Sequence, residues 1–495
     1  MGKEYSVLIA GRAVQALLSI AALRVMTTFL SPAEAGNYFL MLSFATGFSF
    51  FLINPVGMYI NRRLHAWHDG KTLLDRLSVF NAYLLAVSAF ALAATAGLKA
   101  LIGSAPDMPV WAFAALVAAY VYCSSWNMTL IPALNMLGHR LPFVALTVLT
   151  TGLGLLLSLF AVRQVQPFAL LWMTGQIGAM LLAAVAALYA LKSLTGEKYS
   201  GLRAAIGCAD RTSFSGVKAF ALPLAGATVF MWLQTQGYRL IVEARAGAEF
   251  LGYLAVGLGI AASLAAISES LVQQLYYPGF YKKITSDNPD ARRAALAALT
   301  EKALPVYVIL LFFTVSLAPQ LTGLLVHKKF GGAAPFIVFG AFIEFFRMTA
   351  NIMAAAAHSE MRTKLLIRPY AYGGLALCAA AYAAAGSEHN SLLIPLSMAG
   401  AGLVTLLSMW RQVSLVVDVD LNFSLLLKTS AFAAPLLIFL ALKSYTGAMV
   451  SLWILLAAGL YFLWLQYLAA FRWTARQDVT GSAPANGNAE GPAYE

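Results

Sequence analysis

Two arginines that share their spacing to a glutamate and a tyrosine are the residues of this chain best suited to chemistry. Arg24 is followed after ten residues by a glutamate and after fourteen by a tyrosine, and Arg239 is followed by the same residue types at the same spacings. A guanidinium keeps its charge and donates paired hydrogen bonds, which suits a phosphate or diphosphate group. The repeated pattern therefore predicts a cationic site, with Arg24 and Arg239 as its first candidates for ligand binding.

Both arginines lie inside apolar segments of a chain that is 60% hydrophobic and only 11% charged. Charge at bilayer depth is costly and usually marks a function. The alternative is that each arginine pairs with a neighbouring helix or extends to the membrane interface.

The composition predicts an all-α polytopic membrane protein, because apolar runs of about 20 residues, each long enough to cross a bilayer as a helix, recur along the whole chain. We predict about fourteen such helices, and the continuous runs exclude a β-barrel. The expected spans are residues 6–30, 36–57, 79–101, 110–134, 141–162, 168–191, 217–242, 250–277, 304–326, 334–358, 365–385, 392–410, 425–442 and 449–471.

A polar, basic stretch near the middle divides these spans into two lobes of six helices, which the repeated arginine pattern indicates are parallel duplicates. The expected organisation is an N-terminal lobe at residues 1–191, a cytoplasmic connector at 192–216, a C-terminal lobe at 217–411, two further helices at 412–471, and a largely disordered cytoplasmic tail at 472–495. We infer a monomer, because the two lobes can enclose a cavity without a partner.

Basic residues gather on alternate loops, which predicts that both termini are cytoplasmic. The net charge of +12 thus follows from topology and gives no reason to expect nucleic-acid binding. Cys123, Cys208 and Cys378 lack metal-ligand spacing, so neither a metal site nor a disulfide framework is expected. The first apolar segment is too long for a cleavable signal peptide.

The deep acidic residues predicted from the sequence are Glu269 and Glu344, both in the second lobe. Glu344 lies three residues before Arg347, so the two should face the same side of a helix and pair. The pair is either structural or a coupling device, in which protonation of Glu344 frees Arg347 for the cargo, and Glu269 is a second coupling candidate. No cofactor is expected, while coupling to protons or sodium stays open. Gln234 and Asn351 are candidate cargo ligands, with hydrogen bonding between helices as the alternative.

The run RVMTTFLSPAEAGNY at residues 24–38 resembles the first-hairpin signature of polysaccharide-biosynthesis flippases, and AEFLGY at 248–253 resembles its second-half counterpart. These O-antigen and exopolysaccharide flippases belong to the multidrug/oligosaccharidyl-lipid/polysaccharide exporter superfamily. The resemblance implies two lobes in a V that alternate access, in the bacterial inner membrane. It also implies a polyprenyl-diphosphate-linked oligosaccharide as cargo and polysaccharide polymerase machinery as a partner.

We therefore expect a transporter, a flippase for lipid-linked oligosaccharide used in lipopolysaccharide or other surface polysaccharide synthesis, with Arg24, Arg239 and Arg347 as its cationic contacts. A cation-coupled multidrug antiporter of the same superfamily is the main rival, although the first lobe places no carboxylate inside a span. A membrane glycosyl-transferring enzyme is a weaker rival, because the short outer loops offer no paired carboxylates.

Overall fold

The computed structural model describes residues 2–197, 199–201, 207, 211–284, 288–359, 363–419, 421–442 and 448–473, and these residues are helical apart from short loops. Part of the predicted connector, including Cys208, and the predicted tail from residue 474 onward lie outside the described residues. The first half contains α1 Gly2–Phe29, α2 Pro32–Phe48, η1 Ser49–Ile53, α3 Asn54–Asp69, α4 Leu73–Ile102, α5 Val110–Met136, α6 Arg140–Gln164 and α7 Ala169–Thr195.

The second half begins with α9 Arg211–Trp232. It continues with η2 Leu233–Gly237, α10 Tyr238–Ile284, α11 Pro289–Ser316, α12 Ala318–Leu325, η3 Lys328–Ala333, α13 Ala334–Ser359, η4 Thr363–Leu366, α14 Ile367–Ala385 and α15 Asn390–Val413. The last elements are α16 Phe423–Ala433, η5 Ala434–Leu437, α17 Ile438–Ala441, α18 Ala448–Tyr467 and η7 Leu468–Trp473.

Among the described residues, 11 helical stretches are long and apolar enough to cross a membrane. One of them, Thr228–Ile284, is 57 residues long and holds two expected spans, separated at Gly247, whose φ of 87° interrupts the helix. The remaining expected spans correspond to α1 and α14. The prediction of an all-helical polytopic protein is thus confirmed.

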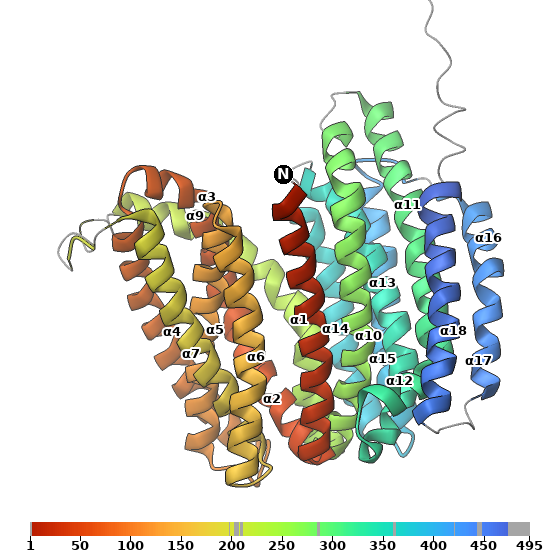
Figure 1. The fold of residues 1–495 in the computed structure, drawn as a ribbon, viewed down its shortest axis with the longest axis horizontal. Helices are drawn as coiled ribbons and strands as arrows, with labels where there is room; N and C mark the ends of the chain where they lie inside the picture. Colours follow the sequence, from red (N-terminus) through yellow and green to blue (C-terminus); the bar gives the residue numbers. More distant parts are fainter. Residues whose placement is uncertain are drawn as a thin grey trace, which may run out of the picture.

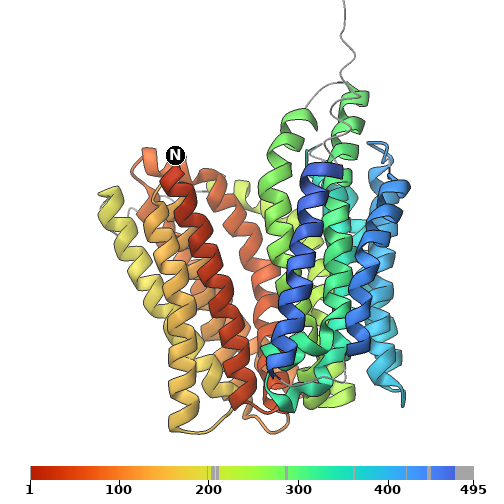
Figure 2. The same ribbon diagram turned by 45° about the vertical axis from the view of Figure 1, so that its right-hand side comes forward.

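The helices form two lobes that converge at one end and splay apart towards the other (Figures 1 and 2). In the first lobe α5 packs between α4 and α7, and α6 packs on α7 and α1. In the second lobe α10, α11, α13, α14 and α15 pack together, with α16 and α18 against α11. Helix α9 lies beside α3 and leads across to the second lobe. We call the converging end, where α1 ends and α2 begins, the closed end; the basic-residue asymmetry predicts that it faces outwards.

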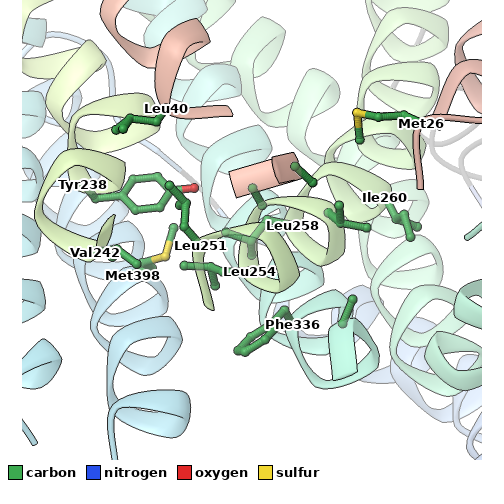
Figure 3. Packing of buried hydrophobic residues seen from close by; sticks show 14 of the residues in the cluster. Met26, Leu40, Tyr238, Val242, Leu251, Leu254, Leu258, Ile260, Phe336 and Met398 are labelled. Carbon is green, nitrogen blue, oxygen red and sulfur yellow. The ribbon is translucent and has the colours of Figure 1, made fainter. Parts of the chain in front are cut away.

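A continuous apolar core joins the lobes near the closed end (Figure 3). Met26 of α1 and Leu40 of α2 belong to the same buried cluster as Leu251 of α10, Phe336 of α13 and Met398 of α15. Because lipid is as apolar as these side chains, close packing rather than exclusion from water is what favours this contact.

The break between α1 and α2 has a clear local cause. Ser31 caps α2 by accepting a hydrogen bond from the Glu34 backbone N–H at 3.2 Å, and Pro32 occupies the first turn of α2, where no helical N–H is needed. Glu34 itself accepts a 2.6 Å hydrogen bond from the backbone N–H of Ala169 at the start of α7. The turn therefore fixes the entry of α2 into the first lobe.

Candidate functional site

Arg239 lies at the start of α10, directly after the π-helical segment η2, and faces the first lobe. Its guanidinium carbon lies 5.2 Å from the centre of the Phe39 ring in α2 and 5.8 Å from that of Tyr238. Its Nε group donates a long hydrogen bond of 3.4 Å to the Tyr238 hydroxyl. No ion pair joins Arg239 to a carboxylate of the described chain. Aromatic faces stabilise a cation without neutralising it, so the edge of the guanidinium stays available to a ligand.

Polar aromatic side chains of the first lobe lie near this guanidinium. Tyr38 of α2 lies close to Arg239, and also to Tyr120 of α5 and Trp172 of α7. A tyrosine hydroxyl can donate or accept, and an indole N–H donates. The group therefore brings one permanent positive charge together with several hydrogen-bonding groups, drawn from four helices of both lobes.

Arg24 lies in α1 and also contacts the opposite lobe. Its Nη1 group donates a hydrogen bond to the backbone oxygen of Val326, the residue that follows α12. Carbonyls at a helix end lack helical partners and accept such donors readily. Within the described ranges the Nε and Nη2 groups of Arg24 make no hydrogen bond and no carboxylate pairs with it.

The segments that follow the two arginines in the sequence form a reciprocal contact between α2 and α10. A Cβ atom added to Gly36 would meet the backbone oxygen of Ala248 and lie 3.1 Å from the backbone nitrogen of Gly252. A Cβ atom added to Gly252 would in turn meet the backbone oxygen of Pro32 and lie 3.1 Å from the backbone nitrogen of Gly36. The contact that Gly36 makes with α10 is thus equivalent to the contact that Gly252 makes with α2. A twofold relationship between duplicated halves requires such a reciprocal pair of contacts.

Arg24 and Arg239 each reach across to the other lobe, so the structure places both at the interface between the halves. The glutamates of the repeated pattern have different surroundings, since Glu34 holds the start of α7 whereas Glu249 lies 3.5 Å from the Tyr253 hydroxyl. Of the residues in the repeated pattern, the arginines therefore have similar positions in the two halves, whereas the glutamates do not.

Arg347 differs from these two because its charge is compensated inside the second lobe. Its Nε lies 2.7 Å from a carboxylate oxygen of Glu344, which confirms the predicted pair, and its Nη2 lies 2.9 Å from an oxygen of Glu269 in α10. The other oxygen of Glu269 accepts a 2.7 Å hydrogen bond from Asn351. Two carboxylates thus share one guanidinium.

Three tyrosines lie close to this carboxylate–arginine cluster of Glu269, Glu344, Arg347 and Asn351. Tyr307 of α11 and Tyr370 of α14 lie close to both Glu269 and Arg347, and Tyr277 lies close to Glu269. The Tyr307 hydroxyl is buried and has no hydrogen-bond partner in the described chain. Among the residues that the structure describes, no three His, Cys, Asp or Glu side chains are placed to hold a metal ion.

The other two predicted ligands, Gln234 and Asn351, each hydrogen-bond to a side chain of the second lobe. Gln234, in η2, donates a 2.7 Å hydrogen bond to the Thr405 hydroxyl of α15. Asn351 is held by Glu269, so both amides join helices of the second lobe. Among the residues that the structure describes, neither amide hydrogen-bonds to Arg24 or Arg239, and their role as cargo ligands stays a prediction.

Glu243 is a buried acidic residue that the sequence interpretation missed. The predicted span ends at residue 242, one residue before Glu243, but α10 continues through Glu243 and leaves it 6% exposed. One carboxylate oxygen accepts a 2.7 Å hydrogen bond from the backbone N–H of Ala105 in the first lobe, and the other has no partner in the described chain. Its position one helical turn after Arg239 was the available signal.

Lys99 completes this contact between the lobes. Its Nζ donates to the backbone oxygens of Ser104 and Ala105 at 2.7 and 2.8 Å, which holds the loop between α4 and α5 in place against Glu243. The closed end therefore contains a buried polar contact as well as the apolar core.

Comparison with solved structures identifies the architecture. The lipid II flippase MurJ in an inward closed conformation superposes with a TM-score of 0.71 at 12% sequence identity, over 97% of this chain and 100% of that chain. An inward-facing multidrug resistance MATE family transporter of the MOP superfamily superposes with a TM-score of 0.60 at 14% identity, over 81% of this chain and 95% of that chain. No protein-family model matches this chain, and neither does the sequence of a curated protein. At these identities the likeness concerns the fold alone: this is a multi-span membrane protein with the two-lobed fold of MurJ and of the MATE transporter.

Proposed function

We propose that this protein is an alternating-access flippase that moves a polyprenyl-diphosphate-linked oligosaccharide from the cytoplasmic to the outer leaflet of the bacterial inner membrane. The observation that carries the proposal is Arg239, a permanently charged side chain at the interface of the lobes that no carboxylate of the described chain neutralises. Cell-surface polysaccharide synthesis is the process that such a cargo would serve.

A diphosphate headgroup fits this site in charge and in hydrogen bonding. Its oxygens accept the paired donors of a guanidinium, while the hydroxyls of Tyr38 and Tyr120 are suited to the remaining oxygens. The cost of a desolvated cation and the cost of a desolvated anion are both reduced when the two meet. A neutral or cationic cargo would leave Arg239 uncompensated.

The test is flipping of a fluorescent polyprenyl-diphosphate-linked sugar by the full chain in proteoliposomes. Arg239→Gln removes the charge at nearly constant size and should lower the rate at least about tenfold, the effect of one charge-assisted hydrogen bond. Arg245→Gln is the matched control, because Arg245 lies in the same helix but is exposed, with its guanidinium carbon 4.4 Å from the centre of the Tyr382 ring. Equal rates for the parent protein and Arg239→Gln would refute the proposal.

Coupling to a proton or sodium gradient is best assigned to Glu269 and Glu344. Their shared arginine leaves the cluster one negative charge in excess when all three groups are ionised, so a proton or a cation completes its neutralisation. Glu269→Gln should therefore make flipping insensitive to an imposed proton or sodium gradient, while the flipping rate measured without a gradient persists. A gradient response equal to that of the parent protein would remove Glu269 from this role.

The same cluster favours the second candidate, a cation-coupled multidrug antiporter. A carboxylate pair with one guanidinium suits exchange of a proton or metal cation for a cationic drug, whereas Arg24 and Arg239 oppose a cationic cargo. Export of a cationic dye by proteoliposomes, with no flipping of the diphosphate lipid, would decide for the antiporter.

A further inference from the structure

The end of α1 is held to residues 326–329 of the second lobe by three polar contacts. Arg24 donates to the Val326 backbone oxygen, the Thr27 hydroxyl accepts a 3.1 Å hydrogen bond from the His327 backbone N–H, and Lys329 Nζ donates to the Thr28 backbone oxygen at 2.9 Å. We call these three contacts the latch.

The latch contacts belong to the closed arrangement of the lobes. Thr27 is 0% exposed and Val326 is 1% exposed, so neither can rehydrate while the closed end stays shut. Parting the lobes breaks all three hydrogen bonds, since each joins α1 to a segment about 300 residues later in the chain. Breaking the two bonds that involve the buried Thr27 and Val326 is costly without replacement partners, whereas the Lys329 contact is exposed to replacement by other partners.

Arg24 is the member of the latch that an anion can recruit. Its bond to Val326 is to a neutral oxygen, and a phosphate oxygen is a stronger acceptor for a guanidinium than a carbonyl. The contacts of Thr27 and Lys329 differ. The Thr27 hydroxyl already donates within α1 to the backbone oxygens of Leu23 and Arg24, and Lys329 of η3 carries a point charge without the paired donors of a guanidinium.

We propose that Arg24 couples cargo binding to opening of the closed end: the anionic headgroup takes the Arg24 guanidinium from the Val326 carbonyl and so releases the latch. This inference rests on the proposed function, because it assigns the regulation of the same cationic site. It makes Arg24 both a lock in the unloaded protein and a ligand in the loaded one, whereas Lys329 is only a lock.

The experiment measures the distance between the lobes directly. In full-length protein with Cys123, Cys208 and Cys378 replaced by Ala, spin labels are attached at Trp111→Cys and Leu324→Cys, two exposed sites beside the closed end on opposite lobes. Pulsed dipolar spectroscopy in nanodiscs gives the fractions of short and long distances. The probes are undecaprenyl diphosphate and undecaprenol, which differ in charge at equal chain length.

The parent protein should show the short distance alone and with undecaprenol, and undecaprenyl diphosphate should raise the long-distance fraction about tenfold, as one charge-assisted hydrogen bond allows. Arg24→Gln should be open without any probe and unresponsive to the diphosphate. Lys329→Ala should also be more open without a probe but should keep its response. Arg245→Gln should match the parent protein, and Arg24→Lys, which keeps charge but loses the paired donors, should be intermediate.

The outcomes separate the two proposals. Arg24→Gln with the short distance of the parent protein overturns the latch, whatever the cargo. Equal opening by undecaprenol, or loss of the response in Lys329→Ala, overturns release through Arg24. An open Arg24→Gln together with no response of the parent protein to the diphosphate retains the latch but overturns both its release by a diphosphate and the proposed cargo.

Discussion

Adding one methyl group at Gly36 is expected to hold the two lobes apart at the closed end. The new Cβ would meet the backbone oxygen of Ala248 and lie 3.1 Å from the backbone nitrogen of Gly252. Both atoms are backbone of α10 in the opposite half, and backbone cannot rotate away as a flexible side chain can. The change must therefore be absorbed by separating α2 from α10, which the closed form opposes and the open form permits.

The size of the effect follows from the cost of overpacking. Inserting a methyl group into a close backbone contact costs about 1–3 kcal/mol, so Gly36→Ala should lower the ratio of closed to open protein roughly 5- to 150-fold. The assay is the distance distribution between spin labels at Trp111→Cys and Leu324→Cys, compared with and without the substitution. We expect a new long-distance population in the absence of any ligand.

Two glycines of α10, the helix that Gly36 contacts, provide the controls. A Cβ at Gly259 would meet nothing within 4 Å, so Gly259→Ala should leave the distances unchanged. A Cβ at Gly257 would lie 2.6 Å from the Ala333 oxygen and from Phe336 Cβ, both in the second lobe, so Gly257→Ala should lower the melting temperature without opening the lobes. If Gly36→Ala keeps the short distance of the parent protein, the reciprocal glycine contact does not control closure and the reasoning is wrong.

Three further substitutions test separate parts of the structure. Arg347→Gln should reduce stability by about 3–5 kcal/mol, because two largely buried carboxylates lose their shared cation, and Glu344→Gln in the same chain should restore part of the melting temperature; no rescue would contradict the pairing. Glu243→Gln should raise the long-distance fraction of the spin-label pair a few-fold, since a charged acceptor is replaced by a neutral one at a cost of about 1 kcal/mol; unchanged distances would show that this contact does not hold the lobes. Gly247→Ala should lower the melting temperature, by about 1 kcal/mol of stability, because a φ of 87° disfavours a residue with a Cβ; an unchanged or raised value would show that the kink relaxes.

The fold could be predicted from the sequence because few backbone structures are stable inside the hydrocarbon core of a membrane. Every backbone polar group must be satisfied inside the bilayer, so long apolar runs become helices. The expected break between the first two spans is also visible in the residues, where Ser31 and Pro32 stop one helix and start the next. Missed features are those that interrupt a helix without changing its polarity, such as the π-helical segments η1 and η2.

Part of the candidate site could be predicted as well, because charged residues are rare inside the apolar spans and are therefore easily identified in the sequence. The Glu344–Arg347 pair follows from spacing on one helix, which fixes which faces meet. The partners that join different helices do not follow, since a single sequence gives no distance between Arg347 and Glu269 or between Arg24 and Val326. Glu243 was misplaced for a related reason: the end of a span was read from hydropathy, but the helix runs on through a polar residue that finds its partner in the opposite lobe.

The three deep arginines differ in what happens to their charge when the lobes move. Glu344 and Glu269 accompany Arg347 within one lobe, so its compensation survives the motion. Arg24 depends on Val326 and Arg239 on Phe39, both across the interface, so opening removes a partner from each. An unloaded protein would then expose two uncompensated guanidinium groups in a partly dehydrated space, which is costly. Under the proposed function an anionic headgroup removes that cost only when it is bound, so we expect the same two residues to oppose opening of the empty protein and to favour opening of the loaded one.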